Sequence, residues 1–192
     1  MPPLRLGLFG GTFDPPHLGH LVVAQDAVDA LRLDRLLMVP AGVPPHKTDR
    51  VISPAPLRLE MVKAITAGNP SLGVSEVELS RGGPSFSVDT LAHYRDLYPD
   101  GEIFFIMGAD QAETFDTWHE PEKVASLATL VVMAREGSRE LSGHFVPVPV
   151  TRMDISATEI RNRVRVGRSI RYLVPEEVRE IIESNRLYRA EI

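Results

Sequence analysis

The chain has 192 residues, enough to bury one hydrophobic core of ordinary domain size. It contains no cysteine, which excludes disulfides, thiolate metal sites and a cysteine nucleophile. The formal net charge of −5 argues against a general nucleic-acid-binding protein, because recognition of a phosphate backbone needs a basic surface. No apolar run is long enough to cross a bilayer or to form the core of an export signal, so we expect a cytoplasmic protein that does not enter membranes.

The first part of the chain alternates apolar runs with segments of helical periodicity. Residues 4–9 predict a buried strand, and residues 18–31 carry apolar side chains at helical spacing. A second strand over residues 35–40 gives the order strand, glycine loop, helix, strand, which predicts a parallel pair with a right-handed crossover. A loop of turn residues, AGVPPHKTDR, precedes a helix that opens near Pro56.

The rest of the chain continues this alternation. The expected elements are a short strand, a helix and two clear apolar strands: residues 72–79, 88–97, 102–107 and 129–134. Near the C-terminus, SATE at residues 156–159 fits a capping box for a helix that runs to about Val166. PEE at residues 175–177 fits the first turn of a further helix.

Strands that alternate with helices predict an α/β protein with an open, mostly parallel sheet, and we expect a single domain over residues 1–192. In such sheets ligands bind beyond the carboxyl ends of the strands. The loops at those ends contain GGTFDPPH, AGVPPHK, GADQ and AREG, which are rich in glycine, histidine, lysine and arginine. The sequence therefore directs attention to this edge of the sheet.

The loop after the first strand has the features of an anion site. Its glycines allow backbone N–H groups to approach a phosphate, and the helix that follows adds its partial positive charge. His17 at the mouth of that helix and His20 one turn later share a face, so both imidazoles should face the anion. Neither GxxxxGK[ST] nor GxGxxG is present, which argues against a P-loop NTPase and a classical dinucleotide-binding domain. A zinc site on the two histidines stays open as an alternative, although no cysteine or acidic residue joins them at a metal-site spacing.

A basic stretch at residues 152–171 offers positive charge for an anionic ligand. It has six arginines against two acidic residues, a local balance of 6 − 2 = +4. A solvated helix face is the other interpretation of the same charges.

These motifs together resemble a known family. GGTFDPPHLGH matches the HxGH-type nucleotidyltransferase signature, and the chain resembles the bacterial nicotinate-mononucleotide adenylyltransferase family. The resemblance extends over PAGVPPHK, RLEMV, GGPSFSVDTL, FIMGADQAETFDTWHE, VVMAREG and ISATEIRNRVRVGRSIRYLVPEEVREII. It implies a Rossmann-like fold with helices on both faces of the sheet and a small C-terminal helical portion at residues 155–192.

The activity implied by the resemblance is adenylyl transfer in NAD biosynthesis. ATP and nicotinate mononucleotide would give deamido-NAD and pyrophosphate, by direct in-line attack of the mononucleotide phosphate on the α-phosphorus of ATP. Such a phosphate is largely dianionic at neutral pH and needs no general base or protein nucleophile. The resemblance also implies Mg²⁺, held mainly by ATP phosphates and water, with no metal site made of protein ligands.

The resemblance assigns site residues one by one. The implied catalytic residues are His17, His20, Lys47 and Arg161. The implied ATP-binding residues are Gly10, Gly11, Thr12, Phe13, His17, His20, Gly108, Asp110, Ile155, Ser156 and Arg161. The implied pyridine-nucleotide-binding residues are Lys47, Ser85, Thr90, Trp118, His119 and Arg135.

Several alternatives stay open at this point. Trp118 could be a buried anchor, Ser156 a simple helix cap, and Asp14 is interpreted as a turn residue outside the site. Phe86 departs from the tyrosine common in the family, and Glu136 from a common proline. The alternative functions are a related nucleotidyltransferase that uses nicotinamide mononucleotide or another phosphate acceptor, and a nucleotide-binding sensor without turnover. A homo-oligomer also stays open.

Overall fold

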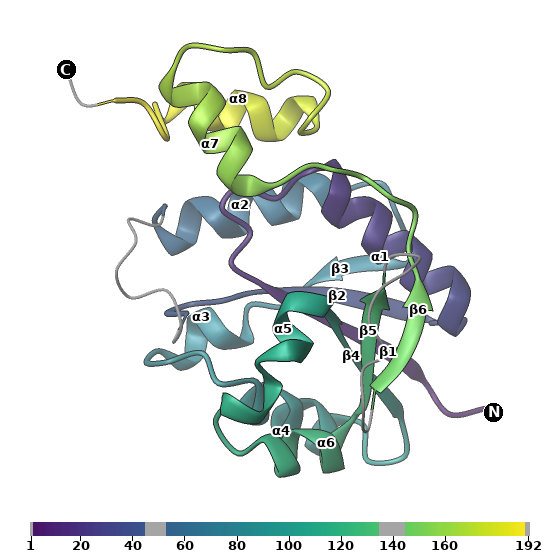
Figure 1. The fold of residues 1–192 in the computed structure, drawn as a ribbon. Helices are drawn as coiled ribbons and strands as arrows, with labels where there is room; N and C mark the ends of the chain where they lie inside the picture. The colour runs from purple at the N-terminus through teal and green to yellow at the C-terminus, as the bar shows by residue number, and fades with distance from the viewer. Residues whose placement is uncertain (1, 45–52, 135–144, 191–192) are drawn as a thin grey trace.

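The strands of the protein form one open parallel sheet. The computed structural model describes residues 2–44, 53–134 and 145–190, and within these ranges the sheet has six strands in the order β3-β2-β1-β4-β5-β6 (Figure 1). The strands are β1 (Arg5–Gly11), β2 (Arg35–Pro40), β3 (Leu72–Val74), β4 (Glu102–Gly108), β5 (Thr129–Ala134) and β6 (Phe145–Pro149). Every neighbouring pair is parallel. The chain builds outward in one direction from β1 and then in the other from β4, so the switch point at which such sheets bind ligands lies between these two strands.

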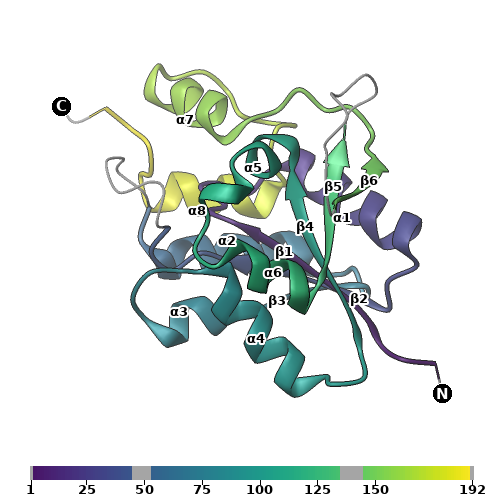
Figure 2. The same ribbon diagram turned by 60° about the horizontal axis from the view of Figure 1, so that its bottom comes forward.

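Helices cover both faces of this sheet. They are α1 (Leu18–Leu31), α2 (Ala55–Thr66), α3 (Val77–Arg81), α4 (Ser87–Leu97), α5 (Ala109–Glu113), α6 (Pro121–Leu127), α7 (Ala157–Arg165) and α8 (Glu176–Ser184), with a 3-10 turn η1 (Phe115–Thr117). Figure 1 shows α1 and α2 on one face and α4 and α6 on the other. The C-terminal helix α8 lies against α2, as Figure 2 also shows. Among the described residues, no helix has the length and apolar character needed to cross a bilayer.

The central strands are buried on both faces, as their apolar sequences predict. In β4, Phe104 and Ile106 belong to the core beneath α1 and α2, whereas Phe105 and Met107 belong to the core beneath α4 and α6. The two-residue period of the strand thus divides the apolar side chains between two cores. The predicted α/β class, parallel sheet and C-terminal helical portion are confirmed.

Two sequence expectations about elements were wrong, and one strand was missed. Gly10 and Gly11 pair with β2 as the last residues of β1 and do not lie in the loop. The predicted strand over residues 72–79 ends at Val74, because the Ser75 hydroxyl accepts from the N–H of Val77 and turns the chain into α3. The strand β6 was missed because FVPVP contains two prolines, which a sheet tolerates at an edge such as this one.

Candidate functional site

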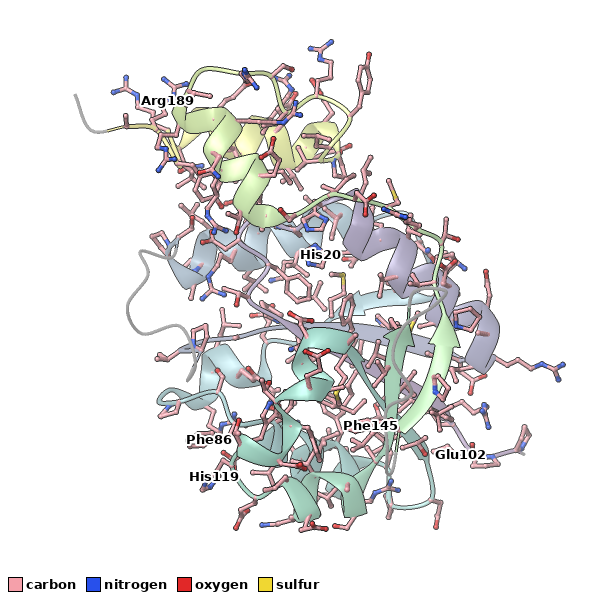
Figure 3. The ribbon with its side chains drawn as sticks, in the orientation of Figure 1. His20, Phe86, Glu102, His119, Phe145 and Arg189 are labelled. Atoms are coloured by element: carbon pink, nitrogen blue, oxygen red, sulfur yellow. The ribbon has the colours of Figure 1, made fainter. Side chains whose placement is uncertain are left out.

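A cleft of about 920 Å³ lies at the carboxyl ends of β1 and β4. Its walls come from the loop after β1, the starts of α1 and α5, the loop before α4 and the start of α7. One end contains His17 and His20, and the other contains the aromatic side chains of Phe86, Trp118 and His119. Figure 3 shows His20 well separated from Phe86 and His119. The cleft therefore joins a histidine end, at a helix N-terminus, to an aromatic end.

The two histidines form a close pair of rings at the start of α1, with their planes tilted by 31°. Their ring centroids are 3.7 Å apart. The backbone N–H of His17 donates to Nδ1 of His20 at 3.1 Å. His20 thus takes the place that Glu or Gln usually has in a capping box, where the third helical residue accepts from the N-cap backbone. Because an N–H can only donate, Nδ1 of His20 must carry a lone pair, and Nε2 carries the proton of the neutral ring. The backbone thus fixes the tautomer of His20.

His17 is buried and neutral in this arrangement. Burial lowers the pKa of His17 to about 4, so the ring is uncharged at neutral pH. Its Nδ1 atom is buried without a hydrogen-bond partner among the described residues. An unsatisfied buried polar atom costs free energy, and at a cleft wall it is available to a ligand.

Because Gly19 has no side chain, the His17 ring can occupy the space beside its Cα. A Cβ atom built on Gly19 would lie 3.0 Å from Nδ1 and 3.1 Å from Cε1 of His17. Gly11 has a comparable role, because a Cβ there would lie 2.8 Å from the ring of Phe13. The Phe13 ring in turn packs edge-on against His20, with centroids 5.1 Å apart.

Arg161 of α7 brings positive charge to the histidine end. Its guanidinium donates to the backbone carbonyl of Asp14 at 2.7 Å and to the Thr158 hydroxyl at 3.1 Å. Ser156 caps α7, because its hydroxyl accepts from the N–H of Glu159 at 3.2 Å. The Glu159 carboxylate pairs with Arg163 in the structure, so the serine half of the predicted capping box is the half observed.

Asp14 is a buried junction between distant segments. Its carboxylate accepts from the hydroxyl of Tyr188 at 2.7 Å and from the N–H of Ser53 at 3.3 Å. Burial is the main cause that raises the pKa of Tyr188, and the neighbouring Asp14 charge acts in the same direction. The interpretation of Asp14 as a simple turn residue was therefore incomplete.

A buried arginine, Arg58, lies beneath the same loop. Its side chain is 1% exposed and donates to four backbone carbonyls, those of Thr12, Ala41, Gly42 and Ser53. Desolvation lowers its pKa, while the Asp14 charge opposes this. Arg58 thus joins the loops after β1 and β2 to the start of α2.

The aromatic end of the cleft has a partly exposed tryptophan. Trp118 packs on Phe105 and Phe115, with centroids 6.0 and 5.5 Å away, and the side chain also lines the cleft. Beside it, the ring centroids of Phe86 and His119 lie 4.3 Å apart, with the ring planes tilted by 30°. A planar heterocycle suits such a wall, because aromatic surfaces stack in offset geometry.

A buried carboxylate lies next to this aromatic end. Glu78 of α3 accepts from the hydroxyl of Thr90 at 2.7 Å and also hydrogen-bonds to Ser85. Ser85 lines the cleft, whereas Thr90 is 1% exposed and lies behind the wall. Burial raises the pKa of Glu78, and its hydrogen bonds to Thr90 and Ser85 and the charge of Arg81 oppose that shift.

Most of the residues expected from the sequence meet in this cleft. Those that line it are Gly10, Gly11, Thr12, Phe13, His17, His20, Ser85, Gly108, Asp110, Trp118, His119, Ile155, Ser156 and Arg161. Thr90 does not line it, and Lys47 and Arg135 lie outside the described residues. The sequence interpretation missed Gly19, Arg58 and Glu78, although GH and RLEMV lay inside motifs that had been noted.

The acidic side chains of the cleft do not gather into a cation site. Asp14, Glu78 and Asp110 come from three separate segments. In the part of the chain that the structure describes, no three His, Cys, Asp or Glu side chains lie together as metal ligands. This donor set does not fit a cation held by protein ligands alone.

Comparison with known proteins defines the class of this chain. Residues 8–163 match the family model described as cytidylyltransferase-like, so the chain belongs to that class. The chain is 48% identical over 188 residues to a probable nicotinate-nucleotide adenylyltransferase of Thermus thermophilus, a match that covers 97% of this chain and 100% of the relative. It is 44% identical to a probable nicotinate-nucleotide adenylyltransferase of Exiguobacterium sibiricum, with coverage of 96% and 99%. The chain therefore belongs to the nicotinate-nucleotide adenylyltransferase family.

A solved structure shares the same fold. The nicotinic acid mononucleotide adenylyltransferase of Plasmodium falciparum, complexed with NaAD, is similar with a TM-score of 0.80 at 16% identity. The match covers 96% of this chain and 97% of that chain. At this identity the likeness concerns the fold.

Proposed function

We propose that this protein joins ATP and nicotinate mononucleotide to give deamido-NAD and pyrophosphate in NAD biosynthesis. The observation that carries the proposal is the close pair of His17 and His20 at a helix N-terminus beside the switch point, in a chain of this family. The attacking group is the phosphate of the mononucleotide. It is largely dianionic at neutral pH, so the protein has to position the reactants and stabilise charge, and it supplies no nucleophile.

At the histidine end, the proposal assigns the ATP phosphates to three groups of donors. His20 donates from Nε2, His17 from whichever nitrogen carries its proton, and the N-terminus of α1 adds its partial positive charge. Arg161 and the capped start of α7 face the same space and would stabilise charge on the departing pyrophosphate. Mg²⁺ would be held by phosphate oxygens and water, and it would neutralise part of the triphosphate charge.

At the aromatic end, the proposal assigns the pyridine ring to Trp118. The half-buried Trp118 lines the cleft, and its contacts with Phe105 and Phe115 hold the indole in place. Ser85 and His119 flank this position, and Thr90 stands behind Ser85. Family resemblance supports roles for Lys47 and Arg135 in binding the acceptor.

The first experiment measures turnover with different acceptors. Purified protein with ATP and Mg²⁺ is given nicotinate mononucleotide, nicotinamide mononucleotide or phosphopantetheine, and pyrophosphate and the adenylylated product are both quantified. We expect turnover with nicotinate mononucleotide to exceed that with phosphopantetheine by orders of magnitude. Tight ATP binding with no product from any acceptor would favour the sensor, and preference for phosphopantetheine would move the protein to another activity.

A histidine variant tests the phosphate end. His20→Ala should lower kcat by about 100-fold or more, since it removes a preorganised donor to developing negative charge. The matched control is His93→Ala, which removes an exposed histidine of α4 outside the cleft and should leave kcat unchanged. A normal rate for pure His20→Ala would remove this residue from the mechanism.

A further inference from the structure

The hydroxyl groups beside the aromatic end are organised by one buried carboxylate. Glu78 is 7% exposed and lines the cleft. The Thr90 hydroxyl donates to it at 2.7 Å, and the Ser85 hydroxyl hydrogen-bonds to the same carboxylate. Ser85 also accepts from the backbone N–H of Gly42 at 2.8 Å. The polar wall next to the proposed pyridine position is therefore one connected network.

The number of protons in this network decides whether the Ser85 hydroxyl can donate a hydrogen bond to a ligand in the cleft or only accept one. A hydroxyl has one proton to donate and two lone pairs. When Glu78 is ionised, it can only accept, so the protons of Ser85 and Thr90 both point to it. Ser85 then presents a lone pair to the cleft, which suits an amide N–H of a ligand and opposes a carboxylate.

Protonation of Glu78 reverses this polarity. A neutral carboxylic acid donates its own proton to one hydroxyl, and that hydroxyl can turn its proton toward the cleft. Protonation also removes the like charge that a pyridine carboxylate would meet there, so both effects have the same sign. The charged described groups that face Glu78 are Arg81 of α3, which favours ionisation, and Asp89 of α4, which opposes it. Burial is the largest influence on the group and favours the neutral form.

We propose that Glu78 is a specificity-determining residue. When Glu78 is protonated, the Ser85 hydroxyl can donate to the carboxylate of an acid acceptor. When Glu78 is ionised, the Ser85 hydroxyl can only accept from the N–H of an amide acceptor. Binding of nicotinate mononucleotide is then accompanied by uptake of one proton at Glu78, and binding of nicotinamide mononucleotide is not. This inference rests on the proposed function and adds to it the residue that discriminates between the two acceptors.

The test is the pH dependence of acceptor preference. The ratio of kcat/KM for nicotinate mononucleotide to that for nicotinamide mononucleotide is measured from pH 6 to pH 9. Titration of the acceptor phosphate is common to both acceptors and cancels in the ratio. Above the pKa of Glu78, the ratio should fall by up to about tenfold per pH unit, as expected for one linked proton. Glu78→Gln, which is neutral at every pH and has a carbonyl acceptor and an NH₂ donor group, should make the ratio independent of pH.

A neighbouring carboxylate gives the matched control. Asp89→Asn changes a charge near Arg81, whose guanidinium is 3.9 Å from the Asp89 carboxylate, but leaves the bonds of Glu78 intact. It should therefore keep the pH slope of the wild type. A flat ratio in the wild type, or the same slope in Glu78→Gln, overturns the inference. Absence of product from nicotinate mononucleotide in the wild type overturns the proposed function instead.

A second measurement does not depend on a folded variant. Titration calorimetry of the wild type in buffers of different ionisation enthalpy counts the protons taken up on binding of each mononucleotide near pH 8. Uptake with the acid and none with the amide supports the inference. Equal uptake with both acceptors contradicts it.

Discussion

Gly19 shows at the scale of a single residue why the HxGH motif needs its glycine. The space beside the glycine Cα is filled by the His17 ring, which a Cβ atom would approach to 3.0 Å. The two histidine rings are in close contact, with centroids 3.7 Å apart, so a shift of one ring is passed to the other. The absence of a side chain at Gly19 therefore determines where both histidine rings lie.

The variant Gly19→Ala separates stability from activity. Alanine favours a helix interior over glycine by about 1 kcal/mol, so Tm should not fall by more than a few degrees. Displacement of His17 by a few tenths of an ångström should lower kcat about tenfold or more, because catalysis depends on donor placement. Thermal unfolding and steady-state kinetics on the same sample check this. Normal turnover would show that the ring tolerates the added methyl group.

His17 also predicts how stability depends on pH. The pKa of His17 is about 4 in the folded protein and about 6.5 in an unfolded chain, so the unfolded state binds more protons between these values. Stability should therefore fall as pH drops from 6.5 toward 4, by about 3 kcal/mol at most from this group. Urea unfolding at a series of pH values measures it, and His17→Gln should lack this contribution. An unchanged pH profile in the variant would show that His17 is not buried as a neutral ring.

The sequence predicted local relations among site residues better than distant ones. The pairing of His17 and His20 follows from their spacing on one helix face, and so does the cap formed by Ser156. The role of Asp14 could not be inferred, because its partners lie far along the chain. The position of Thr90 behind the cleft wall depends on Glu78, and no spacing rule relates the two.

At the scale of elements, Arg58 holds three segments in register. Its guanidinium satisfies carbonyl groups of two loops that follow parallel strands and of the segment that opens α2. No carboxylate among the described residues forms a direct ion pair with Arg58. Its role is therefore to position the loops through hydrogen bonds to their carbonyl groups. Loops without regular structure gain fixed positions from such shared donors.

The variant Arg58→Lys tests this role. A lysine has one ammonium group and cannot reach four carbonyls in a planar fork, so unfolding free energy should fall by about 2 to 4 kcal/mol. Because the loop of Thr12 would lose its support, kcat should fall as well. The matched control is Arg95→Lys, since Arg95 donates to the carbonyls of Pro99, Gly101 and Leu127 away from the cleft. That control should lose stability with a normal kcat, and equal loss of kcat in both variants would contradict a positioning role for Arg58.

The limits of sequence interpretation at this scale have physical causes. The bounds of α1, β2 and β5 match their predicted ranges, because periodicity and composition agree there. The helix α3 was taken for strand because VEL has apolar residues in alternation, and the hydroxyl of Ser75 decides the local structure. The edge strand β6 depends on its pairing with β5, which local sequence does not reveal.

At the scale of the whole molecule, the site joins segments from both ends of the chain. Strand order places the loops after β1 and β4 side by side, and this order is a tertiary property that the alternation of elements left undetermined. The C-terminal portion then lies against this arrangement through α8 and α2, and the Tyr188 hydroxyl reaches the loop after β1. The helical portion is thus part of the support of the cleft.

Tyr188→Phe tests this long-range support. The ring and its packing are kept, but the bond to Asp14 is lost, so the unfolding free energy should fall by about 1 to 3 kcal/mol. Amide exchange in the loop after β1 should become faster, and kcat should fall severalfold. The control Tyr172→Phe alters a side chain that is 80% exposed and should change neither quantity. Unchanged loop exchange in Tyr188→Phe would show that the loop does not depend on the Tyr188 bond and is held by its other contacts, those of Ser53, Arg58 and Arg161.

The hydrogen bond between Tyr188 and Asp14 also has a consequence for the order of events during protein synthesis. It spans 174 residues of sequence, so a growing polypeptide contains the loop after β1 long before Tyr188 has been added. Until residue 188 has left the ribosome, the loop lacks one of the bonds that hold it. Full support of the loop after β1 is thereby tied to the late steps of synthesis, and a nascent chain does not acquire it when its first strand and helix form.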